Sequence, residues 1–143
     1  MIRRLTATSA SWGPVPLRLA LGVAFVGHGA QKVFGSFGGP GFEKFTSFPA
    51  PFSFMRPSAA WMAAAALAEL VGGALVLLGL FTRVGAFLIT CVMLTVIFGV
   101  LRNKGFFAPE GMEMAVAFLA MALALLITGG GQASVDRMIG GRR

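Results

Sequence analysis

The stretch RLALGVAFVGHGAQK, residues 18–32, decides how this chain folds. With its flanks, residues 16–35, it is long enough to cross about one bilayer's hydrocarbon core as a helix. Yet it carries Arg18, His28 and Lys32, and a charge inside hydrocarbon costs several kcal/mol unless it finds a partner or water. We therefore expect this helix to be packed among others or to line a polar cavity, with acidic partners supplied by the rest of the chain.

One stripe of the predicted helix carries polar residues and two glycines, and the opposite face is apolar. At 100° per residue the polar stripe consists of Arg18, Gly22, Phe25, Gly29 and Lys32, with His28 at its edge. The apolar face, which can meet lipid, consists of Leu19, Val23, Val26 and Ala30.

The composition indicates an integral membrane protein. Hydrophobic residues make up 57% of the 143 residues and charged residues only 12%, whereas a soluble domain has about 25% charged residues. The net charge of +7 does not indicate a nucleic-acid partner, because the basic residues lie at helix ends and in loops, as membrane topology places them. The lipid bilayer is the expected partner. A lone cysteine, Cys91, excludes a disulfide within the chain.

Four apolar spans predict an all-α, four-helix integral membrane bundle forming a single domain over residues 1–143. The spans are about residues 16–35, 58–80, 83–101 and 111–128. The second and third are joined by little more than Phe81 and Thr82, which forces an antiparallel pair. Six Lys and Arg residues lie on the side of the termini and four on the other, which favours cytoplasmic termini.

The loop of residues 36–57 contains six phenylalanines. Phe42, Phe45 and Phe48 recur at helical spacing, which predicts a short amphipathic helix after Gly41. Six phenylalanines would not lie in bulk water, so we expect the loop in the membrane interface or folded over the mouth of the bundle. It is either a lid that rests on the membrane without a ligand or an apolar gate for a lipid-soluble ligand.

Acidic residues occur at the depths where the first helix needs them. Glu69 lies near the middle of the second span, at a depth similar to that of His28, and Glu113 opens the fourth span on the side where Lys32 ends the first. We therefore expect His28 or its neighbours beside Glu69, and Lys32 beside Glu113. Arg18 lies deeper toward the cytoplasm and either reaches Glu69 from below or snorkels to phosphates.

Two interpretations of these residues stay open. They are structural ion pairs that fix helix register, or they line a pocket whose His28–Glu69 couple exchanges protons as a quinone is reduced or oxidised. Gly29, Gly72 and Gly73 leave volume for such a pocket. A metal site is disfavoured, because one histidine and scattered carboxylates do not form a ligand cluster.

In their order and spacing these motifs resemble the DoxX family over residues 14–137. The quoted stretches are LRLALGVAFVGHGAQKVFG (17–35), AELVGGALVLLGLFTRVGA (68–86) and ITGGGQASVD (127–136), with Glu113 between the last two. The matching positions are Arg18, His28, Gly29, Lys32, Glu69, Gly72, Gly73, Gly79, Thr82, Arg83, Glu113, Gly129, Gly131, Ser134 and Asp136.

The family is named for a thiosulfate:quinone oxidoreductase subunit, and bacterial members are linked to membrane complexes that handle oxidative and thiol stress. The resemblance implies a multi-pass protein of the bacterial inner membrane. Such a protein would be a small subunit of a redox system and would contact a quinone or another lipid-soluble ligand. No sequence feature binds haem, flavin or iron–sulfur and no covalent cofactor is expected, so electrons would come from a partner redox protein.

Whether the chain is itself an enzyme, and whether it forms a homo-oligomer, stays open. The alternative is a non-enzymatic scaffold or a carrier for a small solute that uses the same pocket.

Overall fold

The structure, a computed structural model, describes residues 6–107 and 109–140, and these residues contain helices and no strand. The predicted all-α class is therefore confirmed. The elements are α2 (Pro14–Phe34), η1 (Ser36–Gly38), α3 (Gly41–Thr46), α4 (Ser58–Leu78), α5 (Thr82–Thr95), η2 (Val96–Val100), α6 (Glu113–Thr128) and α7 (Val135–Gly140). Each predicted span coincides with one long helix, the third with α5 continued by η2.

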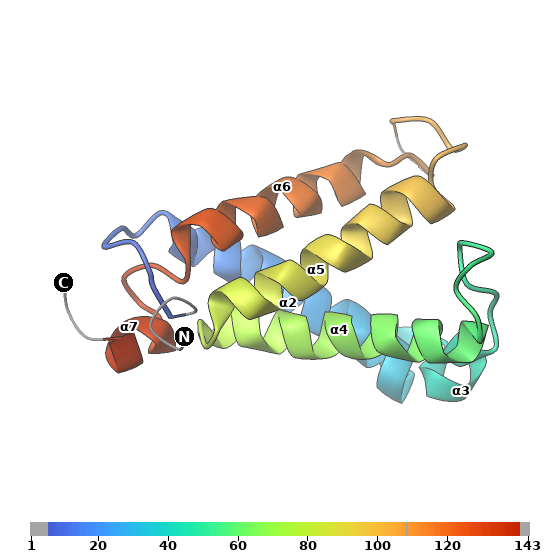
Figure 1. Cartoon of the computed structure of the whole chain (residues 1–143), viewed down its shortest axis with the longest axis horizontal. Coiled ribbons are helices and arrows are strands. Elements are labelled where there is room, and N and C mark those ends of the chain that lie inside the picture. The colour runs from blue at the N-terminus through green and yellow to red at the C-terminus, as the bar shows by residue number, and fades with distance from the viewer. Residues whose placement is uncertain (1–5, 108, 141–143) are drawn as a thin grey trace.

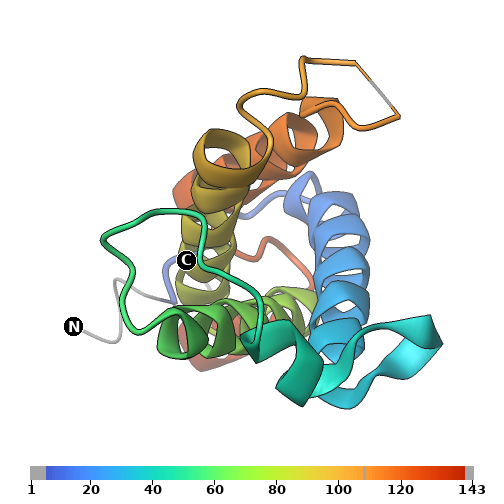
Figure 2. The ribbon, with the colours of Figure 1, turned by 90° about the vertical axis from the view of Figure 1, so that its right-hand side faces the viewer.

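The long helices run back and forth along the longest axis of the molecule (Figure 1). α2 packs on α4, α4 on α5, and α5 on α6, and α6 returns to contact α2, an arrangement that can be followed in the end view of Figure 2. The segment before α2 and the segment after α6 lie at the same end (Figure 1), where Ser9 N–H donates to Thr128 O at 2.9 Å and Gln132 N–H donates to Ser11 O at 2.9 Å. The opposite end carries α3 and the described residues 101–107 and 109–112 (Figure 1).

α2 and α4 approach so closely that their backbones touch at glycines. A Cβ atom added at Gly29 would lie 2.5 Å from Leu70 Cα, and one added at Gly73 would lie 2.6 Å from Val26 N. Gly22 meets Leu77 in the same way. In a membrane the hydrophobic effect does not drive helices together, and close van der Waals packing of their backbones at small residues holds them instead. The expectation that Gly29 and Gly73 leave pocket volume was wrong, because a neighbouring helix fills that space.

α4 and α5 form a V that is closed at the end of the termini (Figure 1). Gly79, at φ 68°, ends α4 in the left-handed conformation. At the start of α5 the Asp136 carboxylate accepts hydrogen bonds from Phe81 N–H (2.7 Å) and Thr82 N–H (2.8 Å). The two helices are in contact at Gly72, where an added Cβ would lie 3.1 Å from Gly85 O, and they diverge beyond it (Figure 1).

The outer surface of the long helices is largely apolar. Among the described residues, two helices are long and apolar enough to cross a membrane by length and composition, Ser58–Leu78 and Thr82–Val100. Only 28% and 39% of their apolar windows are buried, whereas the core helix of a soluble protein is mostly buried. The large apolar side chains that they leave exposed are Trp61, Leu67, Val71, Leu78, Phe87, Leu94, Phe98 and Val100.

The predicted outward face of α2 is partly confirmed. Leu19 and Val23 are exposed by 52% and 61%, as the helical period predicts. Val26 and Ala30 are half-buried, and the backbone of Val26 lies against Gly73. The contact with α4 therefore covers more of α2 than its polar stripe alone.

Replacing Gly29 with alanine is expected to destabilise the protein by about 1–3 kcal/mol, the usual cost of overpacking a tight contact. Gly27→Ala is the matched control, because a Cβ at Gly27 meets nothing within 4 Å. Thermal unfolding in mild detergent should show a lower Tm for Gly29→Ala alone. Equal effects of the two substitutions would contradict the backbone contact.

Candidate functional site

The buried polar feature between α2 and α4 is an ion pair of Lys32 and Glu69. The Lys32 ammonium donates to Glu69 Oε2. The Glu69 side chain is 4% exposed and that of Lys32 is 22% exposed. The partner of Lys32 is thus Glu69, where the sequence predicted Glu113. The reason is the antiparallel register of the two helices, in which Gly29 meets Leu70, so that Lys32 reaches the level of Glu69.

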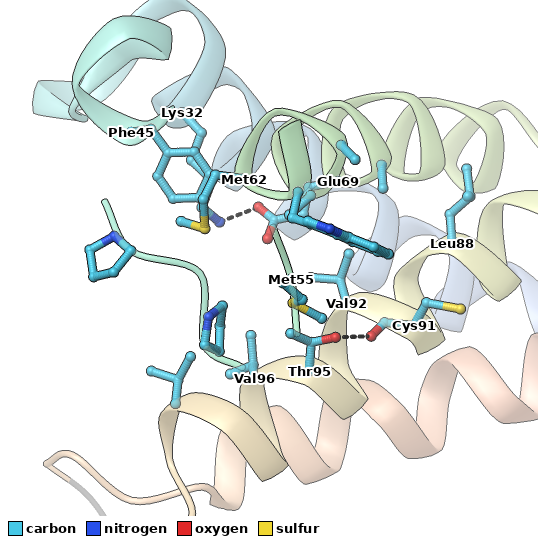
Figure 3. A pocket seen from close by; sticks show the side chains of 17 residues that line it. Lys32, Phe45, Met55, Met62, Glu69, Leu88, Cys91, Val92, Thr95 and Val96 are labelled. Atoms are coloured by element: carbon cyan, nitrogen blue, oxygen red, sulfur yellow. Dashed lines mark hydrogen bonds and ion pairs between the residues drawn. The ribbon is translucent and has the colours of Figure 1, made fainter. Parts of the chain in front are cut away.

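This ion pair lies in the wall of a cavity of about 450 Å³ between α4, α5 and the loop that follows α3 (Figure 3). The cavity fills the diverging part of the V formed by α4 and α5. Apart from the ion pair its lining is almost entirely apolar. The lining residues are Lys32, Phe45, Pro49, Pro51, Met55, Trp61, Met62, Ala64, Ala65, Ala68, Glu69, Leu88, Cys91, Val92, Thr95, Val96 and Val100.

One of the three predicted lid phenylalanines lines the cavity. The short helix expected after Gly41 is present as α3 (Gly41–Thr46), and it places the Phe45 ring with its centroid 5.4 Å from Lys32 Nζ, within range of a cation–π contact. Phe42 and Phe48 are each 42% exposed and do not line it. The Phe45 ring and Met62 lie beside the ion pair in Figure 3.

The α5 wall of the cavity ends in a stretch of π-helix, Val96–Val100. Val96 and Val100, from this stretch, both line the cavity. Such wide turns often occur at functional sites, because they change the direction in which side chains point. The Thr95 hydroxyl just before the stretch donates to Cys91 O at 2.9 Å (Figure 3), so its proton is directed to the helix backbone.

His28 is not part of this site. Its side chain is exposed, its ring packs edge-on to Phe25 at a centroid distance of 6.3 Å, and it does not line the cavity. The predicted His28–Glu69 couple was therefore wrong. Within the described residues, no group of three or more His, Cys, Asp or Glu side chains is arranged to hold a metal ion.

Arg18 lies at the closed end of the molecule. The expectation that it reaches Glu69 was wrong, because its guanidinium is bound elsewhere. It is 4% exposed, and its guanidinium donates to four backbone carbonyl groups. The acceptors are Val76 O at 2.9 Å, Leu77 O at 2.9 Å, Gly130 O at 3.0 Å and Ala133 O at 2.6 Å. Because the first two are end carbonyls of α4, which lack a partner within the helix, Arg18 ties α4 to the segment after α6.

Glu113 is the first residue of α6 and is half-buried. An acidic side chain in the first turn is stabilised by the positive end of the helix dipole. It does not line the cavity. Of the five predicted polar site residues, the structure thus brings Lys32 and Glu69 together and places Arg18, His28 and Glu113 elsewhere.

Several cavity residues have no polar character that could have singled them out in the sequence. Trp61 and Met62 are in α4, and Pro49, Pro51 and Met55 are in the loop before it. The sequence signal they share is that they lie in the phenylalanine-rich loop of residues 36–57 or shortly after it. The loop is held against η2, which continues α5, because Pro51 packs on Gly99, where an added Cβ would lie 2.6 Å from Pro51 Cβ.

These features define a small helical protein with an apolar exterior and a buried ion pair beside an apolar cavity. The model of the DoxX family matches residues 13–102, more than half of the chain. The chain belongs to the DoxX family and is a small membrane protein. No curated protein and no solved structure matches it significantly.

The Lys32–Glu69 pair is expected to show strong energetic coupling. Lys32→Met leaves a carboxylate buried without its partner, which typically costs about 3–5 kcal/mol. Adding Glu69→Leu should recover much of that loss. The measurement is a double-mutant cycle on thermal or denaturant unfolding in detergent.

The matched control is the exposed pair of Lys104 and Glu110, whose Nζ–Oε2 distance is 2.5 Å. The hydrogen bond from Lys104, together with its charge, lowers the pKa of Glu110, but solvent screens the pair and its coupling should be small. Strictly additive losses at Lys32 and Glu69 would show that the two side chains are not paired.

Proposed function

We propose that this protein is a four-span inner-membrane protein that binds a quinone, or a lipid-soluble molecule of similar chemistry, in the Lys32–Glu69 cavity. In this role it serves as the membrane subunit of a redox system. The observation that carries the proposal is the buried ion pair in the wall of an otherwise apolar cavity. Ligand pockets are typically about 300–1,000 Å³, mostly apolar and provided with a few convergent polar groups, and this cavity has each of these properties.

The chemistry of a quinone suits these groups. Its ring can pack against Phe45, Trp61 and Met62, and its carbonyl oxygen can accept a hydrogen bond from the Lys32 ammonium. Reduction to the quinol consumes two electrons and two protons. The electrons come from a partner redox protein. Lys32 and Glu69 are the groups of the cavity that can pass a proton to the ring oxygen, as positioned acid and base.

The proposed topology places both termini in the cytoplasm. It is supported by the position of the two described chain ends at one end of the molecule (Figure 1). It is also supported by the sequence, which has six Lys and Arg residues on the side of the termini and four on the other, since cytoplasmic ends carry an excess of basic residues. Four crossings then give a bundle in the bacterial inner membrane. The phenylalanine-rich loop faces the outer side.

Cysteine labelling in whole cells tests this topology. Ala10 and Ser47 are both exposed, and each is replaced by cysteine in a Cys91→Ala background. An impermeant maleimide should label the cysteine at position 47 in intact cells and the cysteine at position 10 only after lysis. The reverse pattern would overturn the orientation, and labelling of both in intact cells would overturn the number of crossings.

Tryptophan fluorescence tests quinone binding directly. In a Trp12→Phe background the remaining tryptophan is Trp61, which lines the cavity, so a bound quinone should quench its emission in a saturable titration. Lys32→Met removes the hydrogen-bond donor and should weaken binding by about tenfold, equivalent to the loss of one charged hydrogen bond. Mass spectrometry of lipids retained after mild extraction identifies the natural ligand.

Two controls make this result specific. Lys104→Met removes a lysine from the exposed pair, which is not part of the cavity lining, and should leave the titration unchanged. Glu69→Gln keeps the shape and an acceptor oxygen but cannot exchange a proton near neutral pH. It should keep binding and lose any quinone-dependent electron transfer. Absence of saturable quenching in the parent protein would favour a scaffold or a carrier for a small solute.

A further inference from the structure

We propose that the ligand enters the cavity sideways from the membrane, between α4 and α5, and that it is a molecule whose long apolar tail stays in the bilayer. For the identity of the head group this inference rests on the proposed function. The entry route and the apolar tail go beyond the proposed function. The evidence for them is the divergence of α4 and α5 and the exposure of the residues at the rim of the cavity.

The cavity has a buried inner end and an exposed outer rim. Glu69, at the inner end, is 3% exposed. On α4 the lining residues Trp61 and Ala64 are exposed, and on α5 the lining residue Cys91 is exposed. These residues belong to the two helices that are apolar and long enough to cross a membrane. The rim therefore faces the surface that lipid would cover.

A loop lies across the other possible entrance of the cavity. The loop before α4 crosses the open end of the V, where Pro51 packs tightly on Gly99, and Phe45 of α3 lies over the ammonium of Lys32. Pro49, Pro51 and Met55 of this loop are lining residues. A ligand from the aqueous side would have to displace this cover, whereas one from the bilayer passes only the exposed rim.

The α4 side of the opening is lined by alanines. Ala64, Ala65 and Ala68 face the cavity. Small residues in membrane helices usually serve close helix packing, but here the helix contact is made at Gly72 and Gly85, and the alanines lie where α4 and α5 have already diverged. They leave a smooth passage between the inner ion pair and the rim.

The dimensions favour a tailed ligand. A volume of about 450 Å³ suits a ring head group together with the first part of its tail, in the range of ordinary ligand pockets. A tail of many isoprene units cannot fit inside it. The remainder of the tail must pass the rim and lie along α4 and α5 in the lipid, which an isoprenoid quinone does without leaving the bilayer.

The test compares a tailed quinone with a tail-free analogue of the same ring, using Trp61 quenching in the full-length protein in nanodiscs. Ala64→Leu narrows the rim without touching the ion pair. It should weaken binding of the tailed quinone by about tenfold, as expected if some 60 Å² of apolar tail surface lose their contact, and should change binding of the analogue less than about threefold. Ala120→Leu, at an exposed alanine of α6 outside the cavity, is the matched control.

Cys91→Phe narrows the opening from the α5 side and should give the same selective loss, which keeps the test decisive if Ala64→Leu does not fold. A quinone carrying a photoreactive group in its tail should cross-link to peptides containing the rim residues of α4 and α5. If both quinones bind the parent protein and rim substitutions weaken both equally or neither, lateral entry is overturned. If neither quinone binds the parent protein, the proposed function itself fails.

Discussion

The contact between α2 and α4 is the constraint on which the rest of the structure depends. Because the two backbones touch at Gly22, Gly29 and Gly73, the helices cannot slide past each other without a clash. A shift by one helical turn is about 5.4 Å, which would carry the glycines onto side chains and Lys32 past Glu69. The register therefore determines which polar groups meet, and it brings Lys32 to Glu69 in the wall of the cavity.

The two ends of the molecule use buried polar groups for different purposes. At the end of the termini Arg18 donates to four carbonyl groups, and Asp136 accepts from two amides at the start of α5. Gly79 leaves room for the guanidinium, since an added Cβ would lie 2.5 Å from Arg18 Cζ. That end is thus cross-linked by hydrogen bonds, whereas the end with α3 holds the Lys32–Glu69 ion pair and the cavity.

The sequence predicts the class of fold and its helices because hydropathy and turn residues are local signals. It also correctly predicts that a short helix follows Gly41, and it names Lys32 and Glu69 among the candidate polar residues of a pocket. It does not predict their pairing, because counting residues from the start of each span assumes that all spans begin at one level. Lys32 lies in the last turn of α2, whereas Glu69 lies in the middle of α4, and α3 covers α4 where α2 has ended.

The glycines show a second limit of the sequence. A missing side chain leaves space, but the sequence alone does not indicate whether a ligand or another helix fills it. At Gly29 and Gly73 another helix fills this space. The cavity instead arises from the divergence of α4 and α5, which depends on the position of their contact at Gly72 and Gly85 and on the loop that covers the open end. Neither the helix contact nor the position of the loop depends on the charged residues that line the cavity.

The ion pair of Lys32 and Glu69 is difficult to explain by stability alone. Replacing a buried ion pair by apolar residues of similar size is often neutral or stabilising, so such a pair persists where it specifies geometry or serves chemistry. Here the register of α2 on α4 is already specified by three glycine contacts and by the four hydrogen bonds of Arg18. The geometric role is therefore filled by other residues. What remains distinctive about the pair is that it lies in the wall of an apolar cavity, and this position favours a role toward a ligand.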